Sequence, residues 1–429
     1  MSPLVVFSHL RWSFVYQRPQ HLMSRLALHR PVLFIEEPIH DPGPVRLDSS
    51  WQGRSIEVLT PRTPLPARGF DLAQAQLLRP VLRQALRERG LRSPIAWLYT
   101  PLALPLARDL DPALWAYDCM DELSAFQGAS PELPAREREL LALADVVLAG
   151  GPGLADAKRA LRPDVHCMPS AVDVEHFQPG SASEEARQHA EQVQGHLPHP
   201  RLGFFGVIDE RMDLALLAQL ADARPHWQIV MAGPVVKVDP ASLPRRPNLH
   251  WIGMQRYPSL PALMEGWDVC LMPFALNDAT RFISPTKTLE YLAGEKPVVS
   301  TPVPDVLRLY GAVVRTARAG EAFVEACEQA LHETPAQRRQ RLTHAMDVVA
   351  SYSWDGCAQV VQALLEAALK RRQVEAQRKA APAGAGLRIG KPADAGAEAV
   401  LATSRRTVPL PPTAGAGGTR VWALRSGRS

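Results

Sequence analysis

The order of hydrophobic and polar positions predicts an α/β protein built from strand–loop–helix repeats. Short apolar runs of four or five residues recur along the chain, and most are followed by a polar loop and a segment of helical periodicity. The first repeat has an apolar run at 4–7, a polar loop, a helical segment at 20–27 and a second apolar run at 32–35. Such a βαβ unit places its two strands parallel in one sheet.

The pattern runs through two successive halves of similar size, which predicts two α/β domains at 1–179 and 201–350. Between them, the stretch at 180–200 is polar and is broken by Pro and Gly, so it is expected to be an interdomain linker. A terminal helix is expected at 351–370. The segment at 371–429 is rich in Ala, Gly, Pro and Arg, and it is expected to be a disordered basic tail because it cannot bury enough apolar surface to fold.

Each domain is expected to contain several further strands and helices. In the first domain, the pattern predicts strands at 56–59, 95–99, 113–117, 145–149 and 165–168 and helices at 72–89, 102–110, 131–144 and 150–161. In the second domain, it predicts strands at 202–205, 229–232, 249–252, 269–272, 296–300 and 313–315 and helices at 214–221, 260–265, 284–293, 321–332 and 335–349.

The stretch at 268–301 has the clearest strand, loop, helix and strand order in the chain. Ser284 can cap the start of its helix, and Gly294 suits the position just past the helix end. A helix that begins after a strand presents unpaired N–H groups to an anion. We therefore expect an anion to bind near residues 284–287.

Two charged side chains on this helix fit a nucleotide. Lys287 lies in the first turn and adds a positive charge, and Glu290 lies three residues further on nearly the same face. A cation can bind phosphates, whereas a carboxylate can accept hydrogen bonds from the two hydroxyls of a ribose. The alternative is a capped surface helix with a solvated Lys–Glu pair, and the spacing by itself does not decide between the two.

The loop after the first strand is polar and aromatic, and it carries His9, Arg11 and Arg18. Open α/β sheets bind ligands at the carboxyl ends of their strands, so we expect this loop to contact a substrate. A loop packed by its own aromatic residues is the alternative.

Acidic residues follow the strand expected at 113–117. Asp118 and Asp121 lie in this cluster and can serve proton transfer or bind the hydroxyls of an acceptor. The alternative is a helix start, where acids are common because of the helix dipole. The glycines at 150–153 likewise allow two interpretations, close approach to a phosphate or tight packing at a domain cleft.

Composition and charge fit a folded protein without a nucleic-acid partner. The 429 residues are 46% hydrophobic and 21% charged, with a formal charge of +4. The segment at 371–429 carries +8 and the rest of the chain −4, so the expected domains have no basic excess. Any contact with an anionic membrane is therefore expected to be peripheral and to use the tail.

Location and metal content follow from the same inspection. The five cysteines are scattered and form no CxxC pair, which argues against disulfides or zinc and favours a reducing cytoplasm. The first residues lack the features of a signal peptide, and no apolar run approaches the roughly 18 residues of a membrane span. Asp109 and Asp111 have the spacing of a DxD metal motif but precede Pro112 in an ordinary acidic turn, so we expect no metal or other cofactor.

Four segments, in this order and spacing, resemble the GT-B glycosyltransferases of the retaining group 1 type. They are ADVVLAGGPGLADAKRAL with PSAVDVEHFQP, FFGVIDERMDLALLAQLA, NLHWIGMQRYPSLPALMEGWDVCLMPF, and SPTKTLEYLAGEKPVVST. The resemblance covers about residues 1–370, and the opening HLRWSFVYQRPQHL is similar to a bacterial branch linked to cell-envelope and exopolysaccharide sugars. It implies two Rossmann-like, doubly wound parallel-sheet domains facing a cleft, with the terminal helix returning to the first domain.

The resemblance also implies roles for particular residues. Glu290 matches the family's ribose-binding Glu, and Arg211 and residues 284–287 match the groups that meet the diphosphate. Residues expected to bind the donor are Gly206, Arg211, Asn277, Ser284, Thr286, Lys287 and Glu290. Phe282 departs from the pattern, because many members carry a second Glu there near the transferred sugar. Asp118 and Asp121 are expected in the region where members often have a His near the reaction centre.

The implied reaction is transfer of a sugar from a nucleoside diphosphate sugar to the hydroxyl of a carbohydrate or lipid-linked acceptor, with retention, in polysaccharide or glycolipid synthesis. Cationic groups rather than a divalent metal would neutralise the leaving diphosphate. Two alternatives remain open at this point. One is a sugar-nucleotide epimerase of GT-B shape, and the other is a non-catalytic carbohydrate-binding or scaffold protein.

Overall fold

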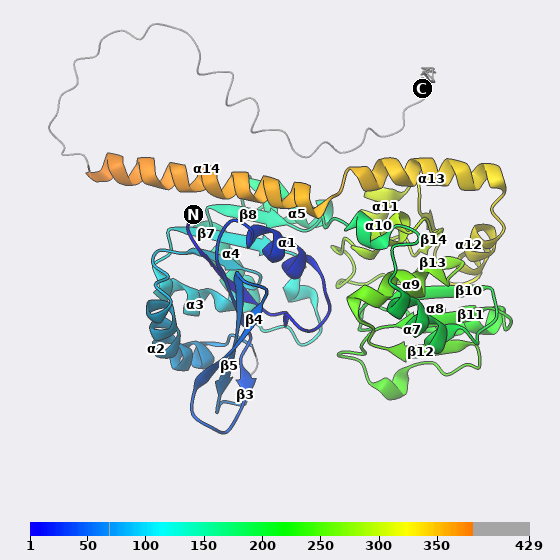
Figure 1. The fold of residues 1–429 in the computed structure, drawn as a ribbon, viewed down its shortest axis with the longest axis horizontal. Coiled ribbons are helices and arrows are strands. Elements are labelled where there is room, and N and C mark those ends of the chain that lie inside the picture. Colours follow the sequence, from blue (N-terminus) through cyan, green and yellow to red (C-terminus); the bar gives the residue numbers. More distant parts are fainter. Residues whose placement is uncertain (68, 381–429) are drawn as a thin grey trace, which may run out of the picture. The chain divides into compact units, whose positions relative to one another are not determined.

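Two parallel β-sheets organise the computed structural model, which describes residues 1–67 and 69–380 (Figure 1). The described residues belong to one compact unit. We call the part around the first sheet, residues 1–177 together with the last helix, the first lobe, and residues 184–350 around the second sheet the second lobe. This architecture confirms the expected α/β class with two Rossmann-like domains.

The first sheet has β1 at its centre, and its order is β3-β5-β2-β1-β6-β7-β8-β9, with β4 on the outer side of β5. Its strands are β1 (Leu4–Ser8), β2 (Val32–Glu36), β3 (Ile39–His40), β4 (Arg46–Gln52), β5 (Ile56–Thr63), β6 (Ile95–Leu98), β7 (Leu114–Cys119), β8 (Val146–Ala149) and β9 (Val165–Cys167). All neighbours pair in parallel except β4 with β5. Every residue of β1, β2 and β6 is buried, as expected of strands covered by helices on both faces.

The antiparallel strand β4 is not predicted by the sequence pattern. Its residues, RLDSSWQ, are mostly polar and show no clear alternation, because four of the seven are exposed at the edge of the sheet. Its partner β5 continues to Thr63, beyond the expected end at 59, and includes Pro61 opposite Leu47.

Short helices cover the first sheet and lie close to the expected segments. They are α1 (Arg18–Leu26), α2 (Leu72–Glu88), α3 (Leu104–Ala107), α4 (Leu133–Leu143), α5 (Pro152–Arg159) and α6 (Val174–Phe177). The helix expected at 102–110 is wrong as a single element. It is three short turns, η1 (Pro101–Ala103), α3 and η2 (Arg108–Leu110), because Pro101 and Pro105 each lack the N–H that a continuous helix needs.

The second sheet has the order β12-β11-β10-β13-β14-β15, and all its printed pairs are parallel. Its strands are β10 (Arg201–Phe205), β11 (Gln228–Ala232), β12 (Leu249–Gly253), β13 (Val269–Met272), β14 (Val298–Ser300) and β15 (Arg315–Thr316). Its helices are α8 (Leu214–Ala223), α9 (Leu260–Glu265), α10 (Lys287–Ala293), α11 (Pro304–Tyr310), α12 (Glu321–Leu331) and α13 (Pro335–Ala350), with 3₁₀ turns η4 (Pro240–Ser242) and η5 (Tyr257–Ser259); another such turn, η3 (Leu123–Ala125), belongs to the first lobe.

A helix replaces the polar linker expected at 180–200. Helix α7 (Glu184–Gln194) is capped by Ser183, whose hydroxyl accepts the N–H of Ala186 at 3.2 Å. Its Glu, Ala, Arg and Gln residues favour a helix, and the glycines and prolines that suggested a linker lie outside it, Gly180 before its start and the others after its end.

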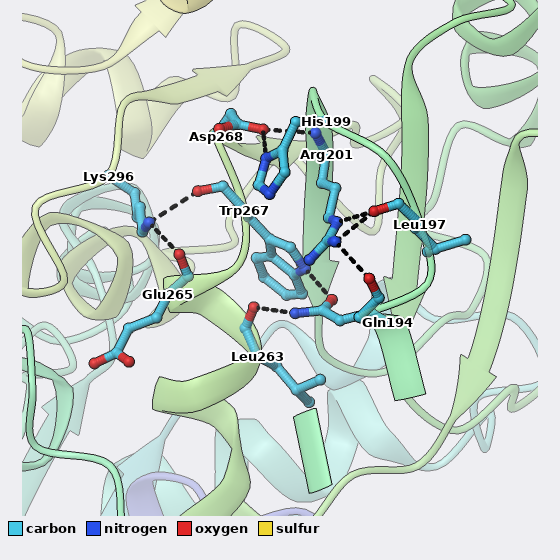
Figure 2. A network of polar contacts seen from close by, with 10 residues as sticks. Gln194, Leu197, His199, Arg201, Leu263, Glu265, Trp267, Asp268 and Lys296 are labelled. Carbon is cyan, nitrogen blue, oxygen red and sulfur yellow. Dashed lines mark hydrogen bonds and ion pairs between the residues drawn. The ribbon is translucent and has the colours of Figure 1, made fainter. Parts of the chain in front are cut away.

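A network of polar contacts holds the end of α7 against the second lobe (Figure 2). The amide of Gln194 donates to the carbonyl of Leu263 and accepts from the indole N–H of Trp267, both at 2.8 Å. Arg201 donates to the carbonyl of Leu197, and Asp268 accepts from the backbone N–H of Arg201 at 2.7 Å. Helix α7 is therefore part of the second lobe.

The last helix, α14 (Trp354–Ala380), returns to the first lobe and runs along α1, β7 and β8 (Figure 1). The indole of Trp354 is 1% exposed and stacks on His21, with ring centroids 4.7 Å apart. The expected end at 370 is wrong, because 371–380 is a run of helix-forming residues without Gly or Pro, and Arg372 pairs with Asp145 at 2.6 Å. The rest of the predicted tail, 381–429, lies outside the described residues.

Two further features bear on the environment of the protein. No helix within the described ranges is both long and apolar enough to cross a bilayer. All five cysteines are free thiols.

Candidate nucleotide-sugar site

A pocket lies between the two lobes, where the carboxyl ends of strands from both sheets meet. Loops that follow β1, β7, β8 and β9 line it from the first lobe, and loops that follow β10 to β13 line it from the second. Of the residues predicted from the sequence, the lining includes Arg18, Asp121, Gly206, Arg211, Ser284, Thr286, Lys287 and Glu290. Residues far apart in the chain meet here because parallel strands end at the same edge of their sheet.

Two cations of the second lobe face this pocket. Lys287 begins α10, and its ammonium lies 5.3 Å from the ring centroids of both Phe204 and Phe274. Gly206 leaves room for it, because a Cβ on that residue would lie 2.9 Å from the lysine Cε, and its φ of 140° is in the region that favours glycine. Arg211 is held by Asp209 through bonds of 2.7–3.1 Å.

The carboxyl of Glu290 lies on the same helix and is 8% exposed. Burial raises its pKa from 4.5 to about 7, although the charge of Lys287 opposes the shift. Burial, and then the charge of Arg211, lower the pKa of Lys287 from 10.5 to about 8. Burial thus disfavours the ionised forms of both groups, which contradicts the alternative of a solvated surface pair.

The expected cap at Ser284 is wrong. Helix α10 begins at Lys287, and its N-cap is Thr286, which has helical backbone angles and makes no side-chain cap. Ser284 instead packs against Gly151 of the first lobe, where an added Cβ would meet the serine Cβ at 2.7 Å. The positive character of the pocket therefore rests on the side chains of Lys287 and Arg211 rather than on a capped helix start.

The glycines at 150–153 serve close packing between the lobes. A Cβ on Gly151 would collide with the carboxylate of Asp305 on α11. That carboxylate accepts the backbone N–H of Gly153 at 2.9 Å, near the start of α5. A second contact joins the same two helices, since Arg308 pairs with Asp156 at 2.6 Å. The structure therefore favours the packing interpretation of these glycines.

Asp118 and Arg18 form a buried ion pair with bonds of 2.9–3.1 Å, and their side chains are 0% and 2% exposed. Arg18 also donates to the carbonyl of Met168 at 2.9 Å. Burial raises the pKa of Asp118, while the charge of Arg18 lowers it. The prediction that Asp118 is an open catalytic acid and Arg18 an acceptor ligand is not supported, because each group already holds the other.

Asp121 lies in the pocket and is near enough to Arg211 and Lys287 to influence the pKa of both. Burial lowers the pKa of His9 to about 4 against the opposing charge of Asp121, so this imidazole is neutral at pH 7. Its Nδ1 atom has no hydrogen-bond partner among the residues that the structure describes. Among the acids after β7, Asp121 is therefore the one placed to meet a substrate.

Three other predicted residues, His9, Arg11 and Asn277, lie outside the pocket lining. Arg11 pairs with Glu36 at 3.0 Å. Asn277 is exposed, and its amide donates to the carbonyl of Glu210 at 3.1 Å. Asp109 of the rejected metal motif pairs with Arg79 and Arg83, at 2.5 and 3.0 Å.

Two aromatic contacts between the lobes are not predicted from the sequence. Phe126, in the loop after β7, lies 5.3 Å from the guanidinium of Arg211 and 4.7 Å from the ammonium of Lys237. Tyr257 stacks on Tyr16 with ring centroids 4.6 Å apart. The sequence shows these aromatics in loops near strand ends but not their partners, which come from the other lobe.

Comparisons with known proteins place this geometry in context. Residues 199–333 match the family model described as Glycosyl transferases group 1. The chain is 29% identical over 198 residues to "Putative teichuronic acid biosynthesis glycosyltransferase TuaH" of Bacillus subtilis. That alignment covers 43% of this chain, and it spans about half, 48%, of the relative.

Solved structures resemble the chain over most of its length. A sucrose-phosphate synthase from Thermosynechococcus elongatus has a TM-score of 0.63 at 16% identity and covers 89% of this chain and 100% of its own. Anabaena Alr3699/HepE in complex with UDP and glucose has a TM-score of 0.62 at 12% identity, with 86% and 100% covered. A UDP-forming trehalose-phosphate synthase from Burkholderia xenovorans has a TM-score of 0.64 at 13% identity, with 85% and 99% covered. At these identities the likeness shows the fold.

Proposed function

Because the chain carries a group 1 glycosyltransferase domain within a GT-B fold, we propose that it transfers a sugar from a nucleoside diphosphate sugar to an acceptor hydroxyl. The observation that carries the proposal is the placement of two cations, Lys287 and Arg211, and the buried carboxyl of Glu290 together in the pocket between the lobes. A nucleoside diphosphate has an anionic diphosphate, which the two cations can bind, and a ribose diol, which can donate hydrogen bonds to the buried carboxylate.

Each side chain has a defined part in this proposal. Glu290 accepts hydrogen bonds from the two ribose hydroxyls. Lys287 and Arg211 contact the diphosphate and stabilise the negative charge that it gains as the sugar leaves, so the reaction requires no divalent metal. The cations stand in a partly buried pocket, where water screens their charge less than in solution.

The first lobe supplies the acceptor side. Asp121 faces the cations across the pocket and is placed to accept a proton from the acceptor hydroxyl or to orient that hydroxyl. His9 stays neutral beside it and can take part in a hydrogen bond through Nδ1. We propose retention at the anomeric carbon, in keeping with the family that the sequence resembles.

The names of the relatives suggest the setting and the first probes. One relative is named for teichuronic acid biosynthesis, and one solved neighbour holds UDP and glucose. We therefore propose synthesis of a cell-envelope polysaccharide or glycolipid, at the cytoplasmic face of the membrane, and UDP as the first ligand to test.

A panel of nucleotides and sugar nucleotides in thermal-shift and calorimetric titrations tests the proposal. A nucleoside diphosphate at 100 times its dissociation constant should stabilise the fold by about 2.7 kcal/mol. Release of the diphosphate that depends on an acceptor supports the transferase. Isomerised donor without acceptor would instead show an epimerase, binding without turnover would show a scaffold, and no binding by any member of the panel would refute the proposal.

A further inference from the structure

We propose that Lys158 is a positioning residue, which holds the loop carrying Asp121 and Phe126 against the pocket and the second lobe. This inference rests on the proposed function for its catalytic meaning. Lys158 lies on α5 and is not among the residues that line the pocket, and nothing in the sequence pattern singles it out.

The lysine is held by two carboxylates in a nearly closed environment. Its side chain is 4% exposed, and its ammonium lies 2.6 Å from Glu122 and 2.7 Å from Glu137. Glu137 on α4 also accepts the hydroxyl of Tyr117 at 2.7 Å. Burial opposes the charge of Lys158, but the neighbouring thiol and carboxylates favour it, and its pKa is raised. The ammonium is therefore charged at neutral pH.

The bond to Glu122 fixes the loop at the residue after Asp121. The other carboxylate oxygen of Glu122 accepts the hydroxyl of Ser124 at 2.7 Å, which ties the following turn to the same point. Further along, Phe126 reaches the cations Arg211 and Lys237 of the second lobe. The loop thus has one anchor in the first lobe and one contact with the second, and Asp121 lies beside the anchor.

Helix α5 gives this anchor a firm base. The N–H of Gly153 in its first turn donates to Asp305 of the second lobe, and Asp156 pairs with Arg308. Lys158 follows in the last turn of the same helix. Lys158 is bonded to two carboxylates and lies on a helix that contacts the second lobe. It can therefore fix the position of the loop relative to α5, whereas an exposed lysine without such bonds could not.

The test compares the full chain with Lys158→Met, the conservative Lys158→Arg and Glu122→Gln. Arg159→Met is a control for loss of a cation from the same helix, because the printed partners of Arg159 are Asp156 and the carbonyl of Val165, neither of which lies in the loop at 120–132. Hydrogen exchange is followed in peptides that cover 120–132 and, as an internal reference, 287–293. UDP affinity and the release of UDP from UDP-glucose are measured in parallel.

We expect Lys158→Met and Glu122→Gln to speed exchange at 120–132 at least tenfold and to lower kcat by a similar factor, with exchange at 287–293 and UDP affinity changed less than twofold. Lys158→Arg should restore much of the loss, and Arg159→Met should resemble the wild type. Unchanged exchange at 120–132, or an equal rise in both regions, would overturn the proposal. If Lys158→Met does not fold, Glu122→Gln decides alone.

The failure of the proposed function would look different. A wild-type chain that binds no nucleotide would refute the nucleotide site, yet the exchange comparison would still decide whether Lys158 holds the loop. Faster exchange at 120–132 without any loss of kcat would overturn the positioning role while leaving the nucleotide site intact.

Discussion

Replacing Glu290 by Gln should make the protein more stable and less able to bind a nucleotide. The carboxyl is 8% exposed, and its pKa rises from 4.5 to about 7. This difference corresponds to roughly 3 kcal/mol by which burial disfavours the charged form. The penalty is absent below pH 4.5, where the carboxyl is protonated in both states, and it is complete above about pH 7. A neutral amide avoids it.

The same substitution weakens the ligand. A hydrogen bond to a charged group contributes roughly 1.5–3 kcal/mol, so the loss of the charge at the ribose hydroxyls should weaken UDP tenfold to hundredfold. We therefore expect two opposite effects. The unfolding free energy should increase at pH 8, with the increase vanishing near pH 4.5, and the affinity for UDP should decrease. A solvated Lys–Glu pair, worth about 0.2–0.5 kcal/mol, could produce neither effect.

Chemical denaturation at pH 8 and 4.5 and calorimetry with UDP and uridine at pH 7.5 give the two quantities. Because the ribose is common to both ligands, Glu290→Gln should weaken them alike. Glu321→Gln is the matched control, since it neutralises an exposed carboxylate in the first turn of α12; it should leave UDP affinity unchanged and, because that charge favours a helix start, should not raise the unfolding free energy at pH 8. Unchanged stability and unchanged affinity in a folded Glu290→Gln protein would refute the assignment of the ribose site.

Further outcomes follow from the same pocket. Lys287→Ala should weaken UDP more than uridine, in calorimetric titrations, because it removes a phosphate contact; equal losses would contradict its role. UDP affinity should decline below about pH 7, as Glu290 is protonated, and above about pH 8, as Lys287 loses its charge, and a flat profile between pH 5.5 and 9.5 would count against both groups. Turnover should persist in excess EDTA, because Lys287 and Arg211 supply the positive charge, whereas a complete loss reversed by Mn²⁺ would revive the acidic triplet at 109–111. Removal of 381–429 should leave UDP affinity unchanged, since the described residues that line the pocket all precede that segment; a lower affinity would refute this, and co-sedimentation with anionic vesicles tests whether the segment binds lipid.

The sequence predicts the parts of the site that depend on strand order. Loops after parallel strands meet at one edge of a sheet, so the pattern of strands predicts that the segments after β10 and β13 lie together, whereas the donor roles of Gly206 and Arg211 come from the resemblance to the family. Glu290 follows from its helical spacing from Lys287. These are local or topological relations, and a single sequence contains them.

What the sequence does not predict depends on partners across the fold. The sequence suggests that Asp118 is an acid available for catalysis. In the structure it pairs with Arg18, which lies a hundred positions earlier in the chain. The side chain of Ser284 resembles a helix cap, but its position is set by packing against Gly151. The sequence pattern does not predict helix α7, because a polar, half-exposed helix and a linker have similar compositions. The contacts of Gln194 in the structure show that this segment is a packed helix.

The return of α14 to the first lobe has a consequence for how the chain is made. Trp354, Val361 and Leu365 are at most 1% exposed and complete the packing beside α1. A ribosome that adds about 5–20 residues per second reaches them roughly 9 to 37 seconds after residue 180. During that interval the first lobe leaves an apolar surface uncovered, so it should depend on chaperones until α14 has been synthesised.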